Sequence, residues 1–183
     1  MPKLPEPAKL SPEEIALVRS RVIYEDAAVL VLDKPAGLLC VPGRGEDKQD
    51  CLSSRVQAQY PDALIVHRLD MATSGLLLMG RGAAAQRMLS LAFAGRHVHK
   101  QYTAVVHGLV PETTDASNGW NLIDLPIAAD WPRRPLRIID AALGKPSQTR
   151  WRIESRNSAA STTRLLLEPL TGRTHQLRVH LRT

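Results

Sequence analysis

The apolar residues of this chain occur in short runs separated by turn residues, and this pattern limits the possible folds more than any other feature. Most runs have the length and β-branched content of strands. They lie at 21–33, 64–66, 76–79, 98–107, 148–155 and 163–170. Helical spacing is found at 48–59, 83–94 and 173–182. Because strands dominate and helices are interspersed irregularly, we predict an α+β fold with a mixed, mainly antiparallel sheet.

Turn residues set the expected ends of several of these elements. Residues 21–33 read as a hairpin, and Lys34-Pro35-Ala36-Gly37 ends its second strand because proline cannot continue a ladder. Gly95 is the expected cap of the helix at 83–94. Residues 111–119 are polar and are expected to form a loop.

With 183 residues, the chain is long enough for one compact domain with a substantial core. We therefore expect an N-terminal leader at 1–20 and one folded domain at 21–183. The leader is rich in proline and charge, and Ser11-Pro12-Glu13-Glu14 resembles a helix start. It lacks the apolar core of a secretory signal, and no apolar run approaches the roughly 18 residues of a membrane span.

The cysteines and the charge balance restrict the class of protein further. Cys40 and Cys51 are eleven residues apart and form no C-x-x-C motif, so we expect reduced, buried thiols in a cytoplasmic protein. The formal net charge of +6 favours a polyanionic partner, because each Lys or Arg that neutralises a phosphate releases a counterion. Basic residues are densest at 131–152, which we expect to contact that partner.

A polar loop between two apolar runs carries the residues best suited to chemistry. It reads His67-Arg68-Leu69-Asp70-Met71-Ala72-Thr73-Ser74-Gly75. Loops held between strands often present reactive side chains. An isolated Asp in a loop usually caps a turn, so the functional interpretation rests on the whole string rather than on Asp70 alone. A kinase is excluded because the Gly-rich loop, the V-A-I-K lysine and the D-F-G motif are missing from the sequence.

The string at 67–75 resembles the catalytic motif of the RluA family of pseudouridine synthases. Four more segments resemble motifs of this family in the same order, namely Asp33–Leu38, Lys100–Ala104, Gly144–Thr149 and Gly172–His180. The resemblance implies an isomerase that converts uridine in RNA to pseudouridine. It also implies that residues 21–183 form a catalytic domain whose sheet surrounds a central RNA-binding cleft.

Two segments, Val41–Arg44 and Asp130–Pro135, resemble most closely the dual-specificity branch of this family. That branch implies two kinds of partner, the tRNA anticodon stem-loop and large-subunit (23S) ribosomal RNA. The leader is too short for the S4 RNA-binding domain that some relatives carry. We expect a monomer that uses no cofactor and no metal, because the isomerisation needs no redox change or group donor.

The resemblance implies three catalytic residues. Asp70 is the essential carboxylate, and it remains open whether it attacks the sugar, attacks the base or abstracts a proton. Arg173 pairs with that carboxylate and favours its charged form, the alternative being a solvated charge near a helix start. Tyr102 stacks under the target uracil, the alternative being core packing with its hydroxyl at the surface.

The target uridine must leave its stack to reach a buried carboxylate, so we expect base flipping. By resemblance, Arg68 fills the vacated space in the RNA, although an ordinary salt bridge is the alternative. For His67, a structural hydrogen bond is the favoured alternative. Trp131 beside Arg133 and Arg134 suits the nucleotides of RNA loops. The expected RNA-binding residues are Lys34, His67, Arg68, Trp131, Arg133, Arg134 and Lys145.

Three further points follow from the sequence. Family members continue for several dozen residues past the position of Thr183, so we expect a domain truncated at its C-terminus, with an uncovered sheet edge. Two other classes stay open: an RNA-binding protein without turnover, and a nuclease or glycosylase that uses Asp70. A nuclease would need clustered carboxylates for metal, and the motif supplies one. His97 and His99 share an expected strand face without the further ligands of a metal site.

Overall fold

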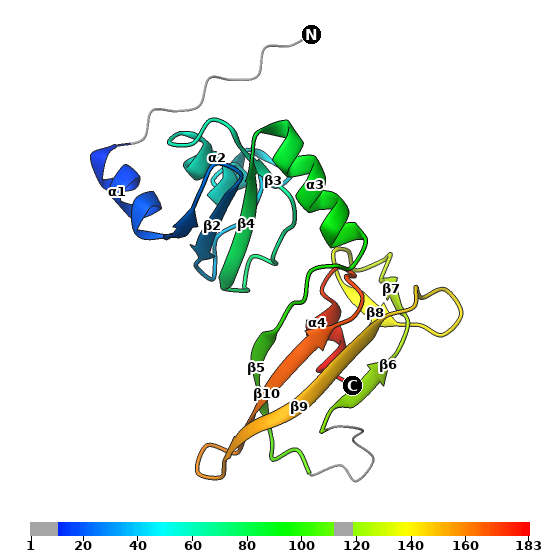
Figure 1. Cartoon of the computed structure of the whole chain (residues 1–183). Helices are drawn as coiled ribbons and strands as arrows, with labels where there is room; N and C mark the ends of the chain where they lie inside the picture. The colour runs from blue at the N-terminus through cyan, green and yellow to red at the C-terminus, as the bar shows by residue number, and fades with distance from the viewer. Residues whose placement is uncertain (1–10, 112–118) are drawn as a thin grey trace. The chain divides into compact units, whose positions relative to one another are not determined.

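The computed structural model describes residues 11–111 and 119–183. The first half of the expected leader and most of the expected loop at 111–119 lie outside the described residues. The chain divides into two compact units, Met1–His97 and Val98–Thr183, each with its own antiparallel sheet (Figure 1).

The first unit is built on a four-stranded sheet with the order β1-β2-β4-β3. Its strands are β1 (Val22–Glu25), β2 (Val29–Lys34), β3 (Ala63–Ile65) and β4 (Gly75–Arg81). The helices are α1 (Pro12–Ser20), α2 (Leu52–Gln57) and α3 (Gly82–Ala94), with a 3-10 turn η1 (Glu46–Lys48). The helix α3 packs against β4 and β3, and α1 contacts α2 and β1.

The core of the first unit follows from strand alternation. Every second residue of β2 is buried, which places Leu30, Leu32 and Lys34 on one face of the sheet. Leu77 and Met79 of the neighbouring β4 are fully buried with them. The core is thus aliphatic on one side and ends at a buried lysine where β2 stops.

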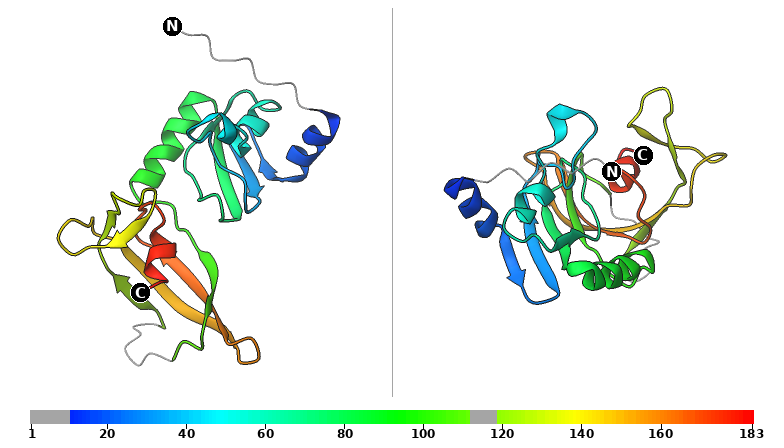
Figure 2. Two further views of the ribbon diagram at one scale, coloured as in Figure 1. Left: turned by 180° about the vertical axis from the view of Figure 1, so that it is seen from behind. Right: turned by 90° about the horizontal axis from the view of Figure 1, so that it is seen from above.

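The second unit contains a four-stranded sheet with the order β5-β10-β9-β6 and a separate hairpin, β7-β8. The long strands are β5 (Tyr102–His107), β6 (Asn121–Asp124), β9 (Gln148–Asn157) and β10 (Thr162–Pro169). The hairpin consists of β7 (Ile127–Ala129) and β8 (Arg137–Ile139), and the last helix is α4 (Gln176–His180). The helix α4, in red in Figure 2, contacts β10 and β8.

The predicted α+β class with mainly antiparallel pairing is confirmed. The hairpin at 21–33 and the helix at 83–94 form as β1-β2 and α3, and Gly95 caps α3. The prediction missed β6, β7 and β8, whose three or four residues are too short to give a clear period.

Three predicted boundaries are wrong, each for a local reason. The helix expected at 48–59 is reduced to α2, because Cys51 pairs with Leu39 in a parallel bridge and its backbone is extended. The strand expected at 98–107 begins at Tyr102, where pairing with β10 starts, so His97 and His99 lie outside the strand. The final helix begins at Gln176 because His175 has a left-handed backbone with φ of 57°.

Candidate functional site

Asp70 lies in the loop between β3 and β4, and the backbone on both sides of it is fixed. Its carbonyl accepts a hydrogen bond of 3.0 Å from Thr73 N–H, which closes a turn. The preceding residue, Leu69, is held by the buried thiol of Cys40. Leu69 N–H lies 3.2 Å from Cys40 Sγ, and the thiol donates back to the Leu69 carbonyl at 3.3 Å. Burial raises the pKa of the Cys40 thiol, so it remains protonated and able to donate at neutral pH.

Lys34 also holds the Asp70 loop in place through hydrogen bonds to backbone carbonyls. Its ammonium group donates to the carbonyls of Pro35 at 2.8 Å, Leu38 at 2.7 Å and Met71 at 3.1 Å. Gly37 N–H also donates to the Met71 carbonyl, at 2.8 Å. Lys34 therefore ties the segment after β2 to the residue that follows Asp70. Burial lowers the pKa of Lys34, and electrostatic interactions with Cys40 and Asp70 oppose that shift.

These contacts correct the expectation that Lys34 binds RNA. The side chain is 0% exposed, and its three N–H groups point to three backbone carbonyls. An ammonium group has three donors, so none remains for a phosphate in this arrangement.

His67 and Arg68 differ in exposure although they are neighbours. The His67 ring stacks on Phe93 of α3, with centroids 4.3 Å apart, and its Nε2 accepts the Leu78 N–H at 3.0 Å. This geometry matches the structural alternative for His67. Arg68 is exposed on the same loop, as a residue that enters RNA must be.

Arg173 lies in the second unit, on the segment before α4, and a buried amide holds its backbone. Gln176 Oε1 accepts the Arg173 N–H at 3.0 Å and the Thr171 hydroxyl at 2.8 Å. Gln176 Nε2 donates to the Gln148 carbonyl at 2.9 Å and to Thr149 Oγ1 at 3.0 Å. All the hydrogen-bonding groups of this side chain are thus satisfied, and the segment is fixed to β9.

Tyr102 is the first residue of β5 and is half-buried. It pairs with Leu167 of β10, which in turn pairs with Trp151 of β9. Thr149, two residues before Trp151, shares that face of the sheet and contacts α4 through Gln176. Tyr102 therefore belongs to the sheet face that α4 covers.

A pocket of about 570 Å³ opens in the second unit between the hairpin β7-β8 and the Arg173 segment. Gly144 lies between the lining residues Leu143 and Lys145, and a Cβ atom on it would lie 2.7 Å from the Pro126 carbonyl carbon, so the close backbone approach there requires glycine. The lining residues are Ile127, Ala128, Ala129, Trp131, Arg134, Arg137, Asp140, Leu143, Lys145, Gly172, Arg173 and Thr174.

Three of the expected RNA-binding residues meet at the edge of the hairpin. The Arg134 guanidinium carbon lies 3.2 Å from the Trp131 ring centroid, so this cation stacks on the indole. Arg133 instead forms an ion pair with the buried carboxylate of Asp130, with Nη2 at 2.7 Å and Nε at 2.8 Å from Oδ2. The arginine pair predicted from sequence therefore divides into one stacking and one anchoring residue.

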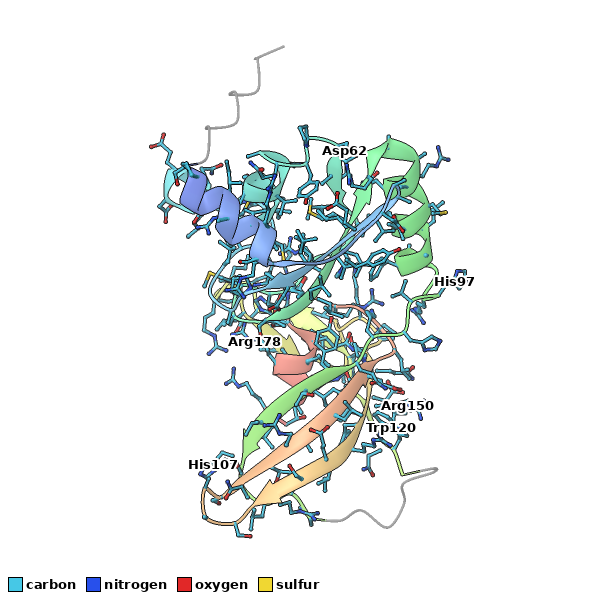
Figure 3. The ribbon with its side chains drawn as sticks, turned by 60° about the vertical axis from the view of Figure 1, so that its left-hand side comes forward. Asp62, His97, His107, Trp120, Arg150 and Arg178 are labelled. Atoms are coloured by element: carbon cyan, nitrogen blue, oxygen red, sulfur yellow. The ribbon has the colours of Figure 1, made fainter. Side chains whose placement is uncertain are left out.

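The basic segment at 131–152 does not form one continuous surface. Arg150 and Arg152 alternate with Thr149 along β9 and lie on the face opposite α4. There they flank Trp120, with guanidinium carbons 5.0 and 4.8 Å from its ring centroid. Figure 3 shows Trp120 and Arg150 side by side. Strand alternation thus separates these two arginines from the pocket.

The site residues are shared between the two units. Asp70, Lys34, His67 and Arg68 belong to the first unit, and the pocket residues, Tyr102 and Arg173 belong to the second. Over residues 11–111 and 119–183, three or more His, Cys, Asp or Glu side chains do not gather into a metal-binding group. Within the same ranges, no helix has the length and hydropathy needed to cross a membrane.

A loop-borne Asp between antiparallel strands, together with a basic pocket that has an exposed indole, suits an α+β enzyme that acts on RNA. Residues 28–183 match the family model of the RNA pseudouridylate synthases, so the chain belongs to that family.

Several relatives share most of the chain. It is 44% identical over 170 residues to the dual-specificity RNA pseudouridine synthase RluA of Escherichia coli K12, covering 93% of this chain and 73% of that protein. The Vibrio vulnificus protein of the same name is also 44% identical, over 88% of this chain and 64% of its own.

Solved human proteins show the same fold. RNA pseudouridylate synthase domain containing 1 superposes with a TM-score of 0.68 at 29% identity, over 87% of this chain and 62% of its own. RNA pseudouridylate synthase domain containing 4 gives a TM-score of 0.69 at 22% identity, over 92% and 67%. The expected resemblance to the RluA family is thereby confirmed.

Sequence reasoning missed Cys40 and Gln176, the two side chains that hold the backbone beside Asp70 and Arg173. Gln176 lies inside the segment Gly172–His180, which resembles a family motif, and this position could have identified it as a site residue. Cys40 had no such signal, because a cysteine with no partner in sequence reads only as a small apolar residue.

Proposed function

We propose that this chain isomerises uridine to pseudouridine in RNA, with the tRNA anticodon loop and large-subunit (23S) ribosomal RNA as substrates. The observation that carries the proposal is the Asp70 loop. Its backbone is fixed by Cys40, Lys34 and a turn to Thr73, while Asp70 itself stays half-buried. The relatives at 44% identity are named dual-specificity RNA pseudouridine synthases.

The reaction sets requirements that the proposed residues can meet. The C–N glycosidic bond breaks, the uracil turns, and a C–C bond forms from the same sugar carbon to uracil C5. The hydrogen at C5 leaves as a proton and a proton is gained at nitrogen, so the product is an isomer. Asp70 serves as the carboxylate that acts on the base or sugar, and Arg173 favours its charged form.

Two further residues act on the base itself. Tyr102 stacks under the target uracil, and such aromatic stacking contributes about 1–3 kcal/mol per base. Arg68, exposed on the Asp70 loop, occupies the space that the flipped uridine leaves in the RNA. Residues 21–183 then act together as the catalytic domain.

The test is tritium release from tRNA transcripts labelled at uracil C5. We expect release by the unaltered chain and a loss of about 1,000-fold or more for Asp70→Asn, which keeps the shape and removes the charge. Asp47→Asn is the matched control, because Asp47 is exposed and lies 3.9 Å from Lys48 in a weak ion pair. Equal release by Asp70→Asn and the unaltered chain would refute the proposal.

The same incubation separates the other classes. A nuclease would shorten the transcript, which denaturing electrophoresis detects. An RNA-binding protein without turnover would bind the transcript but release no tritium, and Asp70→Asn would leave its affinity unchanged.

A further inference from the structure

We propose that the pocket beside the β7-β8 hairpin binds one unpaired nucleotide of the RNA substrate other than the target uridine. The inference rests on the proposed function, and it names a part of the RNA that the enzyme reads. Its starting point is the combination of an exposed aromatic ring, an exposed aliphatic side chain and several cations around one cavity.

The apolar walls suit a nucleobase. Trp131 is 68% exposed and Leu143 is 79% exposed, and both line the pocket. An indole and an aliphatic side chain exposed together around one cavity form an apolar surface that a ligand can cover. Stacking on an indole is the usual way in which proteins hold an unpaired base. Arg134, already stacked on Trp131, extends the platform with a planar guanidinium.

The charges suit a phosphate. Four cations line the pocket, namely Arg134, Arg137, Lys145 and Arg173. Because the proposed function assigns Arg173 to Asp70, the first three are the ones that remain for a phosphate. Asp140 is the single acid among the lining residues, and its Oδ1 accepts the backbone N–H groups of Ala142 and Leu143 at 2.9 and 3.0 Å. The carboxylate is therefore engaged with the loop, and the surplus of positive charge remains for the ligand.

The pocket is also preformed and of suitable size. Lys145 and Ile127 exchange backbone hydrogen bonds of 2.9 and 3.0 Å, which fixes the Lys145 segment to the hairpin. The buried Asp130 anchors the hairpin tip through Arg133. A cavity of about 570 Å³ lies within the ordinary range for sites that bind a small organic ligand.

The occupant differs from the target uridine because the two bases need different aromatic partners. Tyr102, proposed to stack under the target uracil, is not among the residues that line this pocket. A base stacked on Trp131 in this pocket is therefore a different nucleotide from the uracil proposed to stack on Tyr102.

The experiment measures binding of the full chain to a fluorescein-labelled tRNA anticodon stem-loop and to the same stem as a blunt duplex. For Trp131→Ala we expect about 10- to 100-fold weaker binding to the stem-loop and less than 2-fold change for the duplex. Trp131→Phe should restore most of the affinity. Trp120→Ala is the matched control, since Trp120 is flanked by two arginines outside the pocket and should leave both affinities unchanged.

Single abasic substitutions through the loop then identify the nucleotide. At one position other than the target, the abasic RNA should bind the unaltered chain as weakly as Trp131→Ala binds normal RNA. Binding of that abasic RNA to Trp131→Ala should be no weaker than either change alone makes it. The proposal is overturned if Trp131→Ala loses no affinity for the stem-loop, or loses as much affinity for the duplex as for the stem-loop. It is also overturned if Trp120→Ala loses as much affinity as Trp131→Ala, or if the abasic substitution couples to Trp131→Ala at the target position alone.

Tritium release by the unaltered chain, measured on the same stem-loop, keeps this proposal separate from the proposed function. Release together with unchanged binding by Trp131→Ala would overturn the pocket alone. Specific abasic coupling without release would overturn the isomerase and leave the nucleotide pocket standing.

Discussion

At the scale of single residues, Lys34 shows how a charged group can serve as internal scaffold. Its ammonium group is buried and bound to three carbonyls that belong to two loops. Such a group costs free energy to bury, and it is retained only when its hydrogen bonds are complete. Its effect on the Asp70 loop is therefore a matter of backbone position.

We predict that Lys34→Met lowers the free energy of unfolding by about 2–4 kcal/mol, because buried carbonyls lose their donor while the aliphatic stem is kept. Urea denaturation measures the change, and Lys48→Met is the control on an exposed lysine. Equal unfolding midpoints for Lys34→Met and Lys48→Met would contradict the prediction.

The side chains around Lys34 also show what a sequence can reveal about a site. The nine-residue string at 67–75 selected Asp70 as the candidate carboxylate only together with four further motifs in the same order. The burial of Lys34 could not be predicted, since a lysine at the end of a strand is usually exposed. Its environment depends on the carbonyl of Met71, a contact between residues 37 positions apart.

At the scale of elements, α4 is attached to the sheet by polar contacts. His180, 1% exposed, places Nδ1 2.9 Å from Thr149 Oγ1 and Nε2 3.0 Å from the Leu125 carbonyl. Burial lowers the pKa of His180 below its ordinary value of 6.5, although the Leu125 carbonyl and Asp124 oppose the shift. The folded chain therefore holds this ring neutral at a pH where the unfolded chain protonates it.

The sign of the pH dependence follows from that difference. Near and below pH 6.5 the unfolded state binds more protons at His180 than the folded state, so stability falls as the pH falls through this window. We predict that unfolding of the chain becomes easier between pH 7 and pH 5, and that His180→Gln reduces this pH dependence while lowering stability at pH 7. Urea midpoints across the range test it, and an unchanged slope for His180→Gln would contradict it.

The start of α4 marks a limit of sequence-based prediction for elements. Helical spacing extends from Arg173 to Arg182, yet the helix begins three residues later. The Gln176 amide bonds the backbone of its own segment, and His175 takes a left-handed conformation. This local competition between side chain and backbone does not alter the apolar period, so the pattern alone could not place the boundary.

At the scale of the whole molecule, the net charge of +6 makes RNA affinity sensitive to salt. Four of the expected RNA-binding cations, Arg68, Arg133, Arg134 and Lys145, are exposed. If each neutralises one phosphate, the logarithm of the binding constant should fall with the logarithm of salt concentration with a slope of about −3 to −4. Fluorescence anisotropy titrations of the stem-loop at salt concentrations from about 50 to about 200 mM measure this slope. A binding constant that does not change with salt would contradict the prediction.

The division into two units at His97 and Val98 was not visible in the sequence. Composition does not change there, and the flanking residues are those of a helix end and an expected strand. The division arises from pairing: β1 to β4 form one sheet, and β5, β6, β9 and β10 form another. Pairing between distant strands depends on the tertiary fold, whereas the class of each strand could be predicted locally.

The hydrogen bonds around Leu69 and Met71 have a consequence for protein engineering. The carbonyl of Met71 is shared by Lys34 and Gly37, and both backbone polar groups of Leu69 bond to Cys40. The segment at 67–75 therefore cannot keep its conformation when it is transferred to another protein on its own. A designer who grafts it onto a new scaffold must also transplant residues 34–40, or supply equivalent donors and acceptors, before Asp70 can occupy the same place.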